Sequence, residues 1–456
     1  MFKRFLSAVI ALTLVMGMCS CSDSSQSEPN PSAPNSSYSQ PDKPDAPDEP
    51  VPSANGGKVI ELTADKTFTP SDTNKTSDEK FVSGINAFST NLFKTTVKSD
   101  LADGKNTLVS PSSAAFALGM TANGADGNTL KQMLDVMGGG VDMDTFNSNM
   151  NLWISRAHEN NTDKSRLSIA NSVWVKDKDN LTTTEQFAKS CKEVYNAEMF
   201  KAPFDMGTVK KVNDWVSEKT DKMIPSLIEH FNGDEIMCLI NCIAFDSEWD
   251  KQYSDTQVKQ DQKFTNANGD EVKCTMLSST EKCYVANDRA TGFVKDYKGG
   301  KYAFMAVLPD KDTDIADYVS SMSETELCDL YAKRTNEYDV YTKLPQFTFD
   351  YGTELQDYLS QMGMTDAFTG GADFSKMFEN TQAAISKVIH KTHIELSAKG
   401  TKAAAATAVI MKEATAELKD EKPKTVYLDR SFLFAIMDTE LGVPVFIGTV
   451  CDPTVQ

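Results

Sequence analysis

Histidine is the side chain on which most acid–base and nucleophilic sites depend, and this chain has four. None stands in an HExxH pair, and the sequence has no GxSxG elbow, no phosphate-binding P-loop and no GxGxxG turn after a strand. A Ser-His-Asp site could be assembled only arbitrarily, so a secreted hydrolase or a solute-binding lipoprotein has no motif to support it. We therefore predict that the chain is not an enzyme and uses no cofactor and no metal.

The histidines are expected to differ in their surroundings. His230 stands in "IEHFNG", which is typical of a helix end, and needs no function. His390 and His393 lie in one strand-like run three residues apart, so they should point to opposite faces. We predict that His393 is exposed to solvent.

The nine cysteines form no recognisable site. Cys19 would be lost with a leader peptide and Cys21 would carry a lipid, which leaves an odd, scattered set without CxxC or Cys/His clusters. Neither a disulfide framework nor a zinc site is indicated, and Cys238 and Cys242 should be buried as small hydrophobes. The remaining thiols are Cys191, Cys238, Cys242, Cys274, Cys283, Cys328 and Cys451.

The N-terminus has the features of an export signal. Lys3 and Arg4 precede the apolar run "FLSAVIALTLVMGM", which is short for a membrane span. Ser20 before Cys21 is similar to a lipobox, with Cys19 and a plain secretory signal as the alternatives. We expect residues 1–20 to be a lipoprotein-type signal peptide and the protein to be exported, as a cell-surface lipoprotein or an extracellular protein.

Residues 21–77 are expected to be a tether between the lipidated Cys21 and a folded domain. Most of this tract is rich in Ser, Pro, Asp and Asn, and such a composition cannot bury enough apolar surface to fold. The net charge of −19 argues against a nucleic-acid partner, because phosphate binding needs clustered Lys and Arg. A membrane contact is expected only through the lipid.

Residues 78–456 are predicted to form one continuous domain, which must position any functional residue. Phe81, Ile85, Phe88 and Leu92 have helical spacing, and Ser110–Pro111 is typical of a helix start. "EIMCLINCIAF" predicts a strand buried on both faces. "SFLFAIM" and "VPVFIGTV" predict a terminal hairpin across "DTELG". Helices dominate the first half and strands the second, so the fold class is α+β.

Several of these segments together resemble the serpin family. The resemblance rests on "NTLVSPSSAAFALGMTANGADGNTLKQM", "LSIANSVWV", "VNDWVSEKTDKMIPSLI", "LINCIAFDSEWDKQY", "LPQFTFDYGTELQDYLSQMGMTDAF", "VIHKTHIELSAKGTKAAAATA" and "RSFLFAIMDTELGVPVFIGTV", which occur in the family's order. It implies three β-sheets, about nine helices and an exposed reactive-centre loop. It also implies a monomer that inhibits serine proteases irreversibly, through a covalent complex completed when the cleaved loop inserts into the central sheet. The alternative is a non-inhibitory serpin-fold binding protein.

The stretch "GTKAAAATAVIMKEATAELKDEKPKT" fits such a loop. The resemblance makes Gly400 the hinge and Thr401 the first residue to insert. Because strand residues alternate between faces, the inserted face carries small or β-branched, uncharged side chains that suit a packed sheet interior. These residues are Thr401, Ala403, Ala405, Thr407 and Val409.

The scissile bond follows from counting. Fourteen residues after Gly400, the spacing typical of inhibitory members, is Ala414, which places the bond at Ala414–Thr415. A small residue before the bond suits an elastase-like protease. The loop is longer than usual, so two other bonds stay open as alternatives. Lys412–Glu413 would suit a trypsin-like enzyme, and Met411–Lys412 would suit a chymotrypsin-like or subtilisin-like enzyme.

Four further residues match the family's hydrogen-bonded cluster beneath the central sheet. They are His390, Asn241, Ser110 and Ser113. A buried imidazole needs partners, and Asn and Ser can supply both donors and acceptors. Trp249 matches the family's tryptophan at the top of the sheet. The resemblance implies that this set controls opening of the sheet rather than catalysis.

Overall fold

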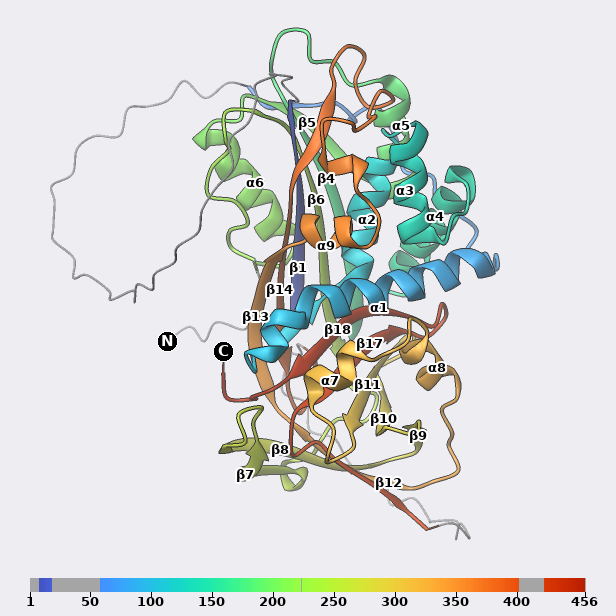
Figure 1. Ribbon diagram of the computed structural model, residues 1–456, viewed down its shortest axis with the longest axis vertical. Helices are drawn as coiled ribbons and strands as arrows, with labels where there is room; N and C mark the ends of the chain where they lie inside the picture. The colour runs from blue at the N-terminus through green and yellow to red at the C-terminus, as the bar shows by residue number, and fades with distance from the viewer. Residues whose placement is uncertain (1–7, 19–57, 223, 402–421, 456) are drawn as a thin grey trace, which may run out of the picture.

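The computed structural model describes residues 8–18, 58–222, 224–401 and 422–455, and of residues 8–18 it places the backbone and the Met16 side chain. The described residues form an α+β fold with three sheets and nine α-helices, as the sequence predicts (Figure 1). The helices are α1 (Glu79–Ala102), α2 (Pro111–Ala122), α3 (Gly127–Gly138), α4 (Met143–Glu159), α5 (Glu185–Tyr195), α6 (Met206–Lys219), α7 (Ile315–Ser320), α8 (Glu326–Ala332) and α9 (Gln356–Gln361).

The large sheet has the strand order β1-β14-β15-β6-β4-β5-β2, with β13 paired to the far side of β14. Most of its pairings are antiparallel, and β4 and β5 are parallel. Its strands are β1 (Ala8–Met18), β2 (Ile60–Glu61), β4 (Ser165–Lys176), β5 (Glu198–Ala202), β6 (Glu235–Glu248), β13 (Phe347–Glu354), β14 (Ala383–Leu396) and β15 (Gly400–Thr401).

Two smaller sheets complete the fold. The second sheet has the order β3-β18-β17-β11-β10-β9, and the third has the order β16-β12-β8-β7. The predicted terminal hairpin is β17 and β18. The strands are β3 (Thr107–Val109), β7 (Val258–Thr265), β8 (Glu271–Glu281), β9 (Cys283–Ala286), β10 (Ala290–Asp296), β11 (Tyr302–Pro309), β12 (Val340–Pro345), β16 (Lys424–Tyr427), β17 (Phe432–Asp438) and β18 (Val443–Val450).

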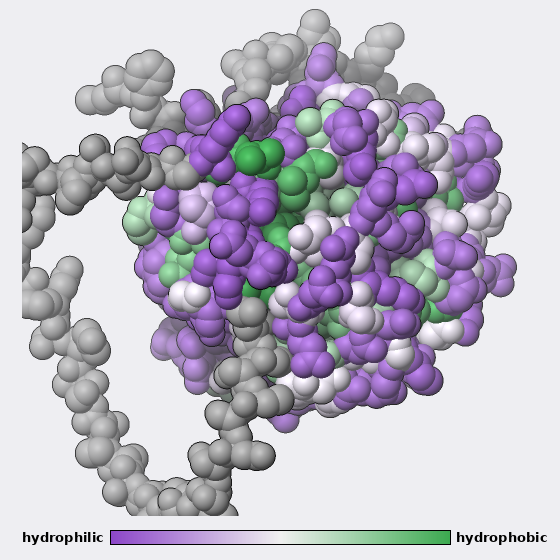
Figure 2. All heavy atoms as spheres, turned by 90° about the horizontal axis from the view of Figure 1, so that it is seen from above, coloured by the Kyte–Doolittle hydropathy of each residue, from purple (hydrophilic) through white to green (hydrophobic). Residues whose placement is uncertain are grey.

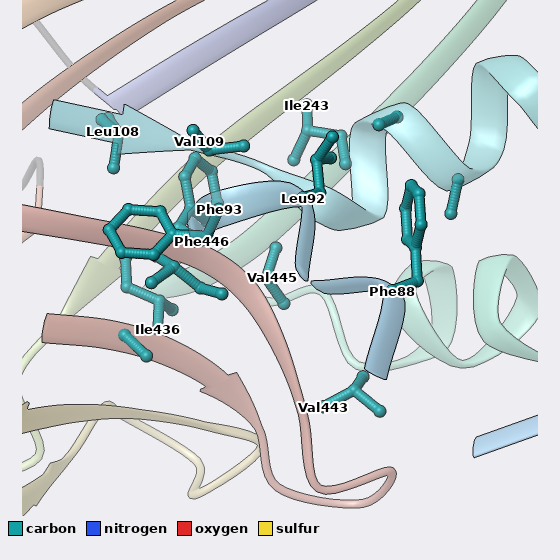
Figure 3. Close-up of a cluster of buried hydrophobic side chains, with 14 of the residues drawn as sticks. Phe88, Leu92, Phe93, Leu108, Val109, Ile243, Ile436, Val443, Val445 and Phe446 are labelled. Carbon is teal, nitrogen blue, oxygen red and sulfur yellow. The ribbon is translucent and has the colours of Figure 1, made fainter. Parts of the chain in front are cut away.

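Local sequence signals explain where the helices begin. Asp78 caps α1 by accepting a hydrogen bond from the Phe81 backbone N–H, and Ser110 caps α2 in the same way. The predicted apolar face of α1 is buried against β3, β6 and the hairpin β17–β18, where the large and second sheets meet (Figure 3). Strand β6 is buried along nearly its whole length, as its unbroken apolar run predicts.

The folded body begins earlier than the sequence suggests. Residues 58–77 were expected to belong to the tether, but β2 pairs with β5 and the Thr63 side chain is buried. The Asn151 side chain donates to the Thr69 carbonyl at 3.0 Å and accepts from the Ser71 N–H at 2.8 Å. These polar anchors hold a stretch whose composition alone gave little sign of folding.

The N-terminal apolar run also contributes a strand. Ala8–Met18 forms β1, which lies between β6 and β14 in the large sheet (Figure 1). Within the described residues, no helix is both long and apolar enough to cross a membrane. The predicted signal peptide and the lipidation of Cys21 stay predictions, and Cys21 itself lies outside the described residues.

The seven cysteines of the described residues are all free thiols. Cys238 and Cys242 are buried on β6, as predicted, against a cluster formed with α6 and β4. Burial raises the pKa of both thiols well above the ordinary range. The end of the molecule that carries β5 and α5 is mainly hydrophilic, with a small hydrophobic patch (Figure 2).

Candidate functional site

The site is centred on the point where the predicted loop leaves the large sheet. Thr401 on β15 pairs with Leu396 of β14 and with Ser247 of β6, so it lies between these two strands. Its side chain is 0% exposed, and its Oγ1 lies 2.6 Å from the Tyr297 Oη, with which it shares a hydrogen bond. We call the space between β6 and β14 the slot, and Gly400–Thr401 the hinge. The hinge has begun to enter the slot.

Gly400 is required by close backbone contact. A Cβ atom at this position would lie 2.1 Å from the Ser247 carbonyl oxygen and 2.8 Å from the Glu248 Cα. Both are backbone atoms of a central strand and cannot swing away. The sequence assigned Gly400 to a hinge for its conformational freedom, and the structure adds a steric reason.

Gly400→Ala is therefore expected to displace the hinge from the slot and to destabilise the protein by about 1–3 kcal/mol, the usual cost of overpacking. Urea unfolding would measure the loss, and hydrogen exchange at β15 would detect the displacement. Gly233→Ala is the control, because a Cβ there meets nothing within 4 Å. Equal stability of the two variants would contradict a steric role for Gly400.

Trp249 holds the turn that precedes the hinge. Its Nε1 donates to the Ser397 carbonyl and its backbone N–H donates to the Lys399 carbonyl, both at 2.9 Å. The buried indole stacks on Tyr297, with ring centroids 4.5 Å apart and planes at 11°. Tyr297 thus links the tryptophan to Thr401. Trp249 thus lies directly after β6 and beside the hinge, and the role that the resemblance implies for it stays a prediction.

A buried ion pair beside Trp249 was not anticipated from the sequence. The Lys295 side chain is 3% exposed, and its Nζ lies 2.7 Å from the Glu281 Oε1. The ammonium also lies 4.6 Å from the Tyr253 ring centroid, a cation–π distance. The Tyr253 N–H donates to the Ala398 carbonyl at 3.0 Å, so the pair supports the same turn. Neither Lys295 nor Glu281 stands in a motif that would have revealed this pairing.

The predicted cluster beneath the large sheet consists of two hydrogen-bonded pairs, His390 with Ser110 and Asn241 with Ser113, which are joined to each other. His390 is 0% exposed, and its Nε2 accepts a hydrogen bond from the Ser110 backbone N–H at 3.1 Å. The Ser113 Oγ donates to the Asn241 Oδ1, and the Ser113 N–H donates to the Ser110 Oγ at 3.2 Å. Ser110 and Ser113 therefore join His390 to Asn241 through the first turn of α2.

Two members of this network were missed. The Asn241 Nδ2 donates to the Asn171 Oδ1 at 2.8 Å, and the Asn171 Nδ2 donates to the Tyr195 carbonyl at 2.7 Å. Ser112 donates to the Val445 carbonyl at 3.0 Å. Asn171 could have been suspected, because an amide inside the apolar run "LSIANSVWV" must find a buried partner.

The His390 imidazole is neutral. Burial lowers its pKa to about 3, because the low-dielectric interior disfavours the cation. As its Nε2 is an acceptor, the proton lies on Nδ1, for which the described residues offer no hydrogen-bond partner. Protonation would place an unpaired charge between the sheet and α2.

This pKa gives a pH dependence with a definite sign. The imidazole of the unfolded chain binds a proton below about pH 6.5, whereas that of the folded protein binds one only near pH 3. The contribution of His390 to stability is therefore complete above pH 6.5 and is lost progressively as the pH decreases from 6.5 to 3. The slope is at most about 1.4 kcal/mol per pH unit. Urea unfolding from pH 7 to 4 should therefore be less steeply pH-dependent in His390→Gln. His230→Gln, at an exposed position, should match the wild type, and identical pH slopes for His390→Gln and wild type would contradict the assignment.

The prediction that His393 is exposed is wrong. Its side chain does leave the face of His390, but it is only 4% exposed, and its Nδ1 hydrogen-bonds the Asp350 Oδ1 of neighbouring β13. This contact holds the pKa of the Asp350 carboxyl below its usual value. Alternation predicted the correct face, but on that face His393 lines a pocket that Ile224, Pro225 and Ser226 also line, so its side chain is not on the open surface.

The rest of the predicted loop lies outside the described residues. This applies to the inserted face beyond Thr401 and to all the residues proposed for the scissile bond, and their assignments stay predictions. They are Ala403, Ala405, Thr407, Val409, Met411, Lys412, Glu413, Ala414 and Thr415. Among the residues that the structure covers, no group of His, Cys, Asp and Glu side chains could hold a metal ion.

Comparisons with known proteins agree with this geometry. Residues 83–453 match the family model described as serpin, serine protease inhibitor. The chain is 29% identical over 375 residues to an uncharacterized serpin-like protein of Methanosarcina acetivorans, with 81% of this chain and 85% of that protein covered. It is also 29% identical over 381 residues to Serpin B6 of Pongo abelii, covering 80% and 97%.

Two solved structures of the thermophilic serpin tengpin are similar in fold. The native state matches with a TM-score of 0.78 and 35% identity, covering 87% of this chain and 100% of that one. The latent state matches with a TM-score of 0.72 and 36% identity, covering 82% and 98%.

Proposed function

The chain belongs to the serpin family, and from this premise we propose that it is an irreversible, suicide-substrate inhibitor of serine proteases. The protease serine attacks the carbonyl carbon of the scissile bond, the amide bond breaks, and an ester joins the inhibitor to the enzyme. Insertion of the cleaved loop into the slot then carries the protease away before water can hydrolyse the ester. The inhibitor supplies the carbonyl and the strand, and the nucleophile is the protease's own serine.

The observation that carries this proposal is the position of Thr401. It is buried and paired with both β6 and β14, so the loop enters the large sheet at the point where insertion would start. If the residues that follow it inserted as a strand, the side chains facing inward would all be small or β-branched and uncharged as far as Val409. A non-inhibitory member would have no need of a strand-compatible face.

The proposed target is an elastase-like or subtilisin-like protease, with cleavage between Ala414 and Thr415. We further propose that the protein acts outside the cell, anchored through Cys21. The support for this location is the lipobox-like "MCSC" together with the tether-like composition of residues 22–57.

The test is to mix the protein, produced without residues 1–20 so that β1 does not fill the slot, with elastase and to run a denaturing gel. A complex that resists heat and detergent is expected, and sequencing of the released C-terminal peptide identifies the bond. Ala414→Glu should abolish the complex with elastase, while the matched variant Ala416→Glu should retain it. Clean cleavage without a complex and without a gain in thermal stability would instead favour the non-inhibitory binding protein.

A further inference from the structure

The buried ion pair of Lys295 and Glu281 lies where the chain passes from the third sheet to the second. Lys295 belongs to β10, and Glu281 is the last residue of β8, one residue before β9 begins. The two side chains are 3% and 12% exposed, and the Lys295 Nζ lies 2.7 Å from the Glu281 Oε1. Apolar side chains of similar size often fill such a space with equal or greater stability, because they do not have to lose the hydration of two charges. Stability alone therefore does not explain a charged pair at this position.

The two aromatic rings that hold the hinge both lie against the Lys295 ammonium. Its Nζ is 4.6 Å from the Tyr253 ring centroid and 5.6 Å from the Trp249 ring centroid, and both distances are within cation–π range. The Tyr253 N–H donates to the Ala398 carbonyl at 3.0 Å. Trp249 stacks on the tyrosine whose hydroxyl shares a hydrogen bond with Thr401. The cation is therefore the point at which the supports of the hinge meet.

Glu281 is linked to the other end of the predicted loop, where the chain returns on β16. Strands β8, β12 and β16 are neighbours in the third sheet, and Glu281 lies opposite Val340, which in turn pairs with Lys424 of β16. The Ser279 Oγ donates to the Glu281 carboxylate and shares a hydrogen bond of 2.9 Å with the Thr342 Oγ1 of β12. The carboxylate is therefore attached to the strands on which β16 rests.

Strand β16 is short and depends on this support. It has four residues, lies at the edge of the third sheet and pairs with β12 alone among the described strands. The Lys424 N–H donates to the Asp339 carbonyl and the Leu428 N–H donates to the Lys343 carbonyl, both at 2.9 Å. A displacement of β8 or β12 would disturb both hydrogen bonds, so the exchange rates of these two amides report on β16.

We propose that Lys295 and Glu281 are positioning residues that hold the two ends of the predicted loop in a fixed relation to each other. The ammonium supports the aromatic residues of the hinge, the carboxylate supports the strands that carry β16, and their 2.7 Å contact joins the two. Displacement of either end should therefore loosen the other, and the coupling must be reciprocal. The coupling does not depend on the proposed function. Its use, which is to present the scissile bond to a protease at a fixed span, rests on that function.

The test displaces one end and observes the other by hydrogen exchange in the full chain. Gly400→Ala displaces the hinge, and exchange is followed at the Lys424 and Leu428 amides of the β16 region. We expect exchange there to become at least about fivefold faster, the lower end of typical coupling between two sites. The Leu62 amide, which donates to the Met199 carbonyl beside the edge strand β2, reports general destabilisation and should change less.

The same change is then made in proteins that lack the pair. Lys295→Met/Glu281→Met replaces both charges with apolar side chains, so its urea midpoint should stay near that of the wild type, whereas Lys295→Met alone should lower the midpoint clearly. In the double variant, Gly400→Ala should leave exchange in β16 unchanged, because the contact that transmits the displacement is gone. Arg289→Met/Glu326→Met removes an ion pair between α8 and the start of β10 and is the matched control.

Two further variants keep the test decisive if the double variant does not fold. Val426→Ser disturbs β16 from the opposite end, because Val426 is 1% exposed, and should increase exchange in β15 by a similar factor. Glu281→Gln keeps the shape of the side chain without its charge, and should weaken both effects. No change at either distant end would overturn the coupling. An undiminished change in the variants of the pair would show that Lys295 and Glu281 do not carry it.

The use of the coupling is tested with elastase, on proteins produced without residues 1–20. The double variant should form the complex at least about tenfold more slowly than the wild type at similar stability, because its scissile bond is no longer held in place. If exchange shows the coupling but no protein traps the protease, the coupling stands and the proposed inhibitory function fails. If the double variant traps elastase as fast as the wild type, the pair does not position the loop for the protease.

Discussion

Replacing Thr401 with arginine is expected to convert the inhibitor into an ordinary substrate that is cleaved and released. Thr401 is fully buried between β6 and β14 and shares a hydrogen bond with Tyr297. An arginine cannot enter this space without burying an unpaired charge, which costs about 3 kcal/mol or more. At 1.4 kcal/mol per factor of ten, the partition between trapping and release should shift by at least about 100-fold.

The measurement is the ratio of complexed to cleaved inhibitor on a denaturing gel, over a range of inhibitor-to-protease ratios. Thr425→Arg is the matched control, because Thr425 is exposed on β16, at the other end of the loop. It should leave trapping intact. If Thr401→Arg formed as much complex as wild type, insertion through the hinge would not be the trapping mechanism.

Replacing Trp249 with alanine is expected to destabilise the protein by about 3–5 kcal/mol and to free the hinge. The indole is 1% exposed, stacks on Tyr297, and holds the Ser397 carbonyl through its Nε1. Its removal leaves a cavity and deprives the turn before the hinge of an anchor. Thr401 would then lose the tyrosine that its hydroxyl contacts.

Urea unfolding and limited proteolysis of the loop measure the two effects. Trp215→Ala removes a largely buried tryptophan from α6, far from the hinge in the fold, and serves as the control (Figure 1). It should lower stability without changing the rate of proteolysis in the loop. Trp249→Phe should recover part of the stability, because it retains a ring against Tyr297. Unchanged loop proteolysis in Trp249→Ala would show that the tryptophan does not hold the hinge.

The parts of the fold that the sequence predicted are those in which one local pattern decides the outcome. The helical spacing of Phe81, Ile85, Phe88 and Leu92 determines the buried face of α1, and the unbroken apolar run of β6 requires burial on both faces. The three sheets followed from family resemblance rather than from any pattern within the strands. The order of the strands depends on distant pairings, which no single segment encodes.

The candidate site was predicted less completely, for physical reasons that differ between residues. His390, Asn241, Ser110 and Ser113 were placed together by resemblance, and the structure connects them. His393 was misjudged because alternation gives the face of a strand but not what covers that face.

The other features that the sequence did not predict depend on residues far apart in the chain. The pairing of Lys295 with Glu281 joins neighbouring strands of two different sheets, and sequence spacing gave no sign of it. The run that forms β1 has two possible uses, because an uncharged apolar segment suits a membrane leader and a buried strand equally well, so the signal peptide stays a prediction.

The buried thiols of β6 make the protein its own reporter of sheet opening. Cys238 and Cys242 are held as unreactive thiols by burial, and both lie on a strand that borders the slot. Alkylation proceeds through the thiolate, so each cysteine can be labelled only while the structure around β6 is open. The rate at which iodoacetamide modifies Cys238 and Cys242 therefore measures how often the structure around β6 opens, and no probe has to be introduced.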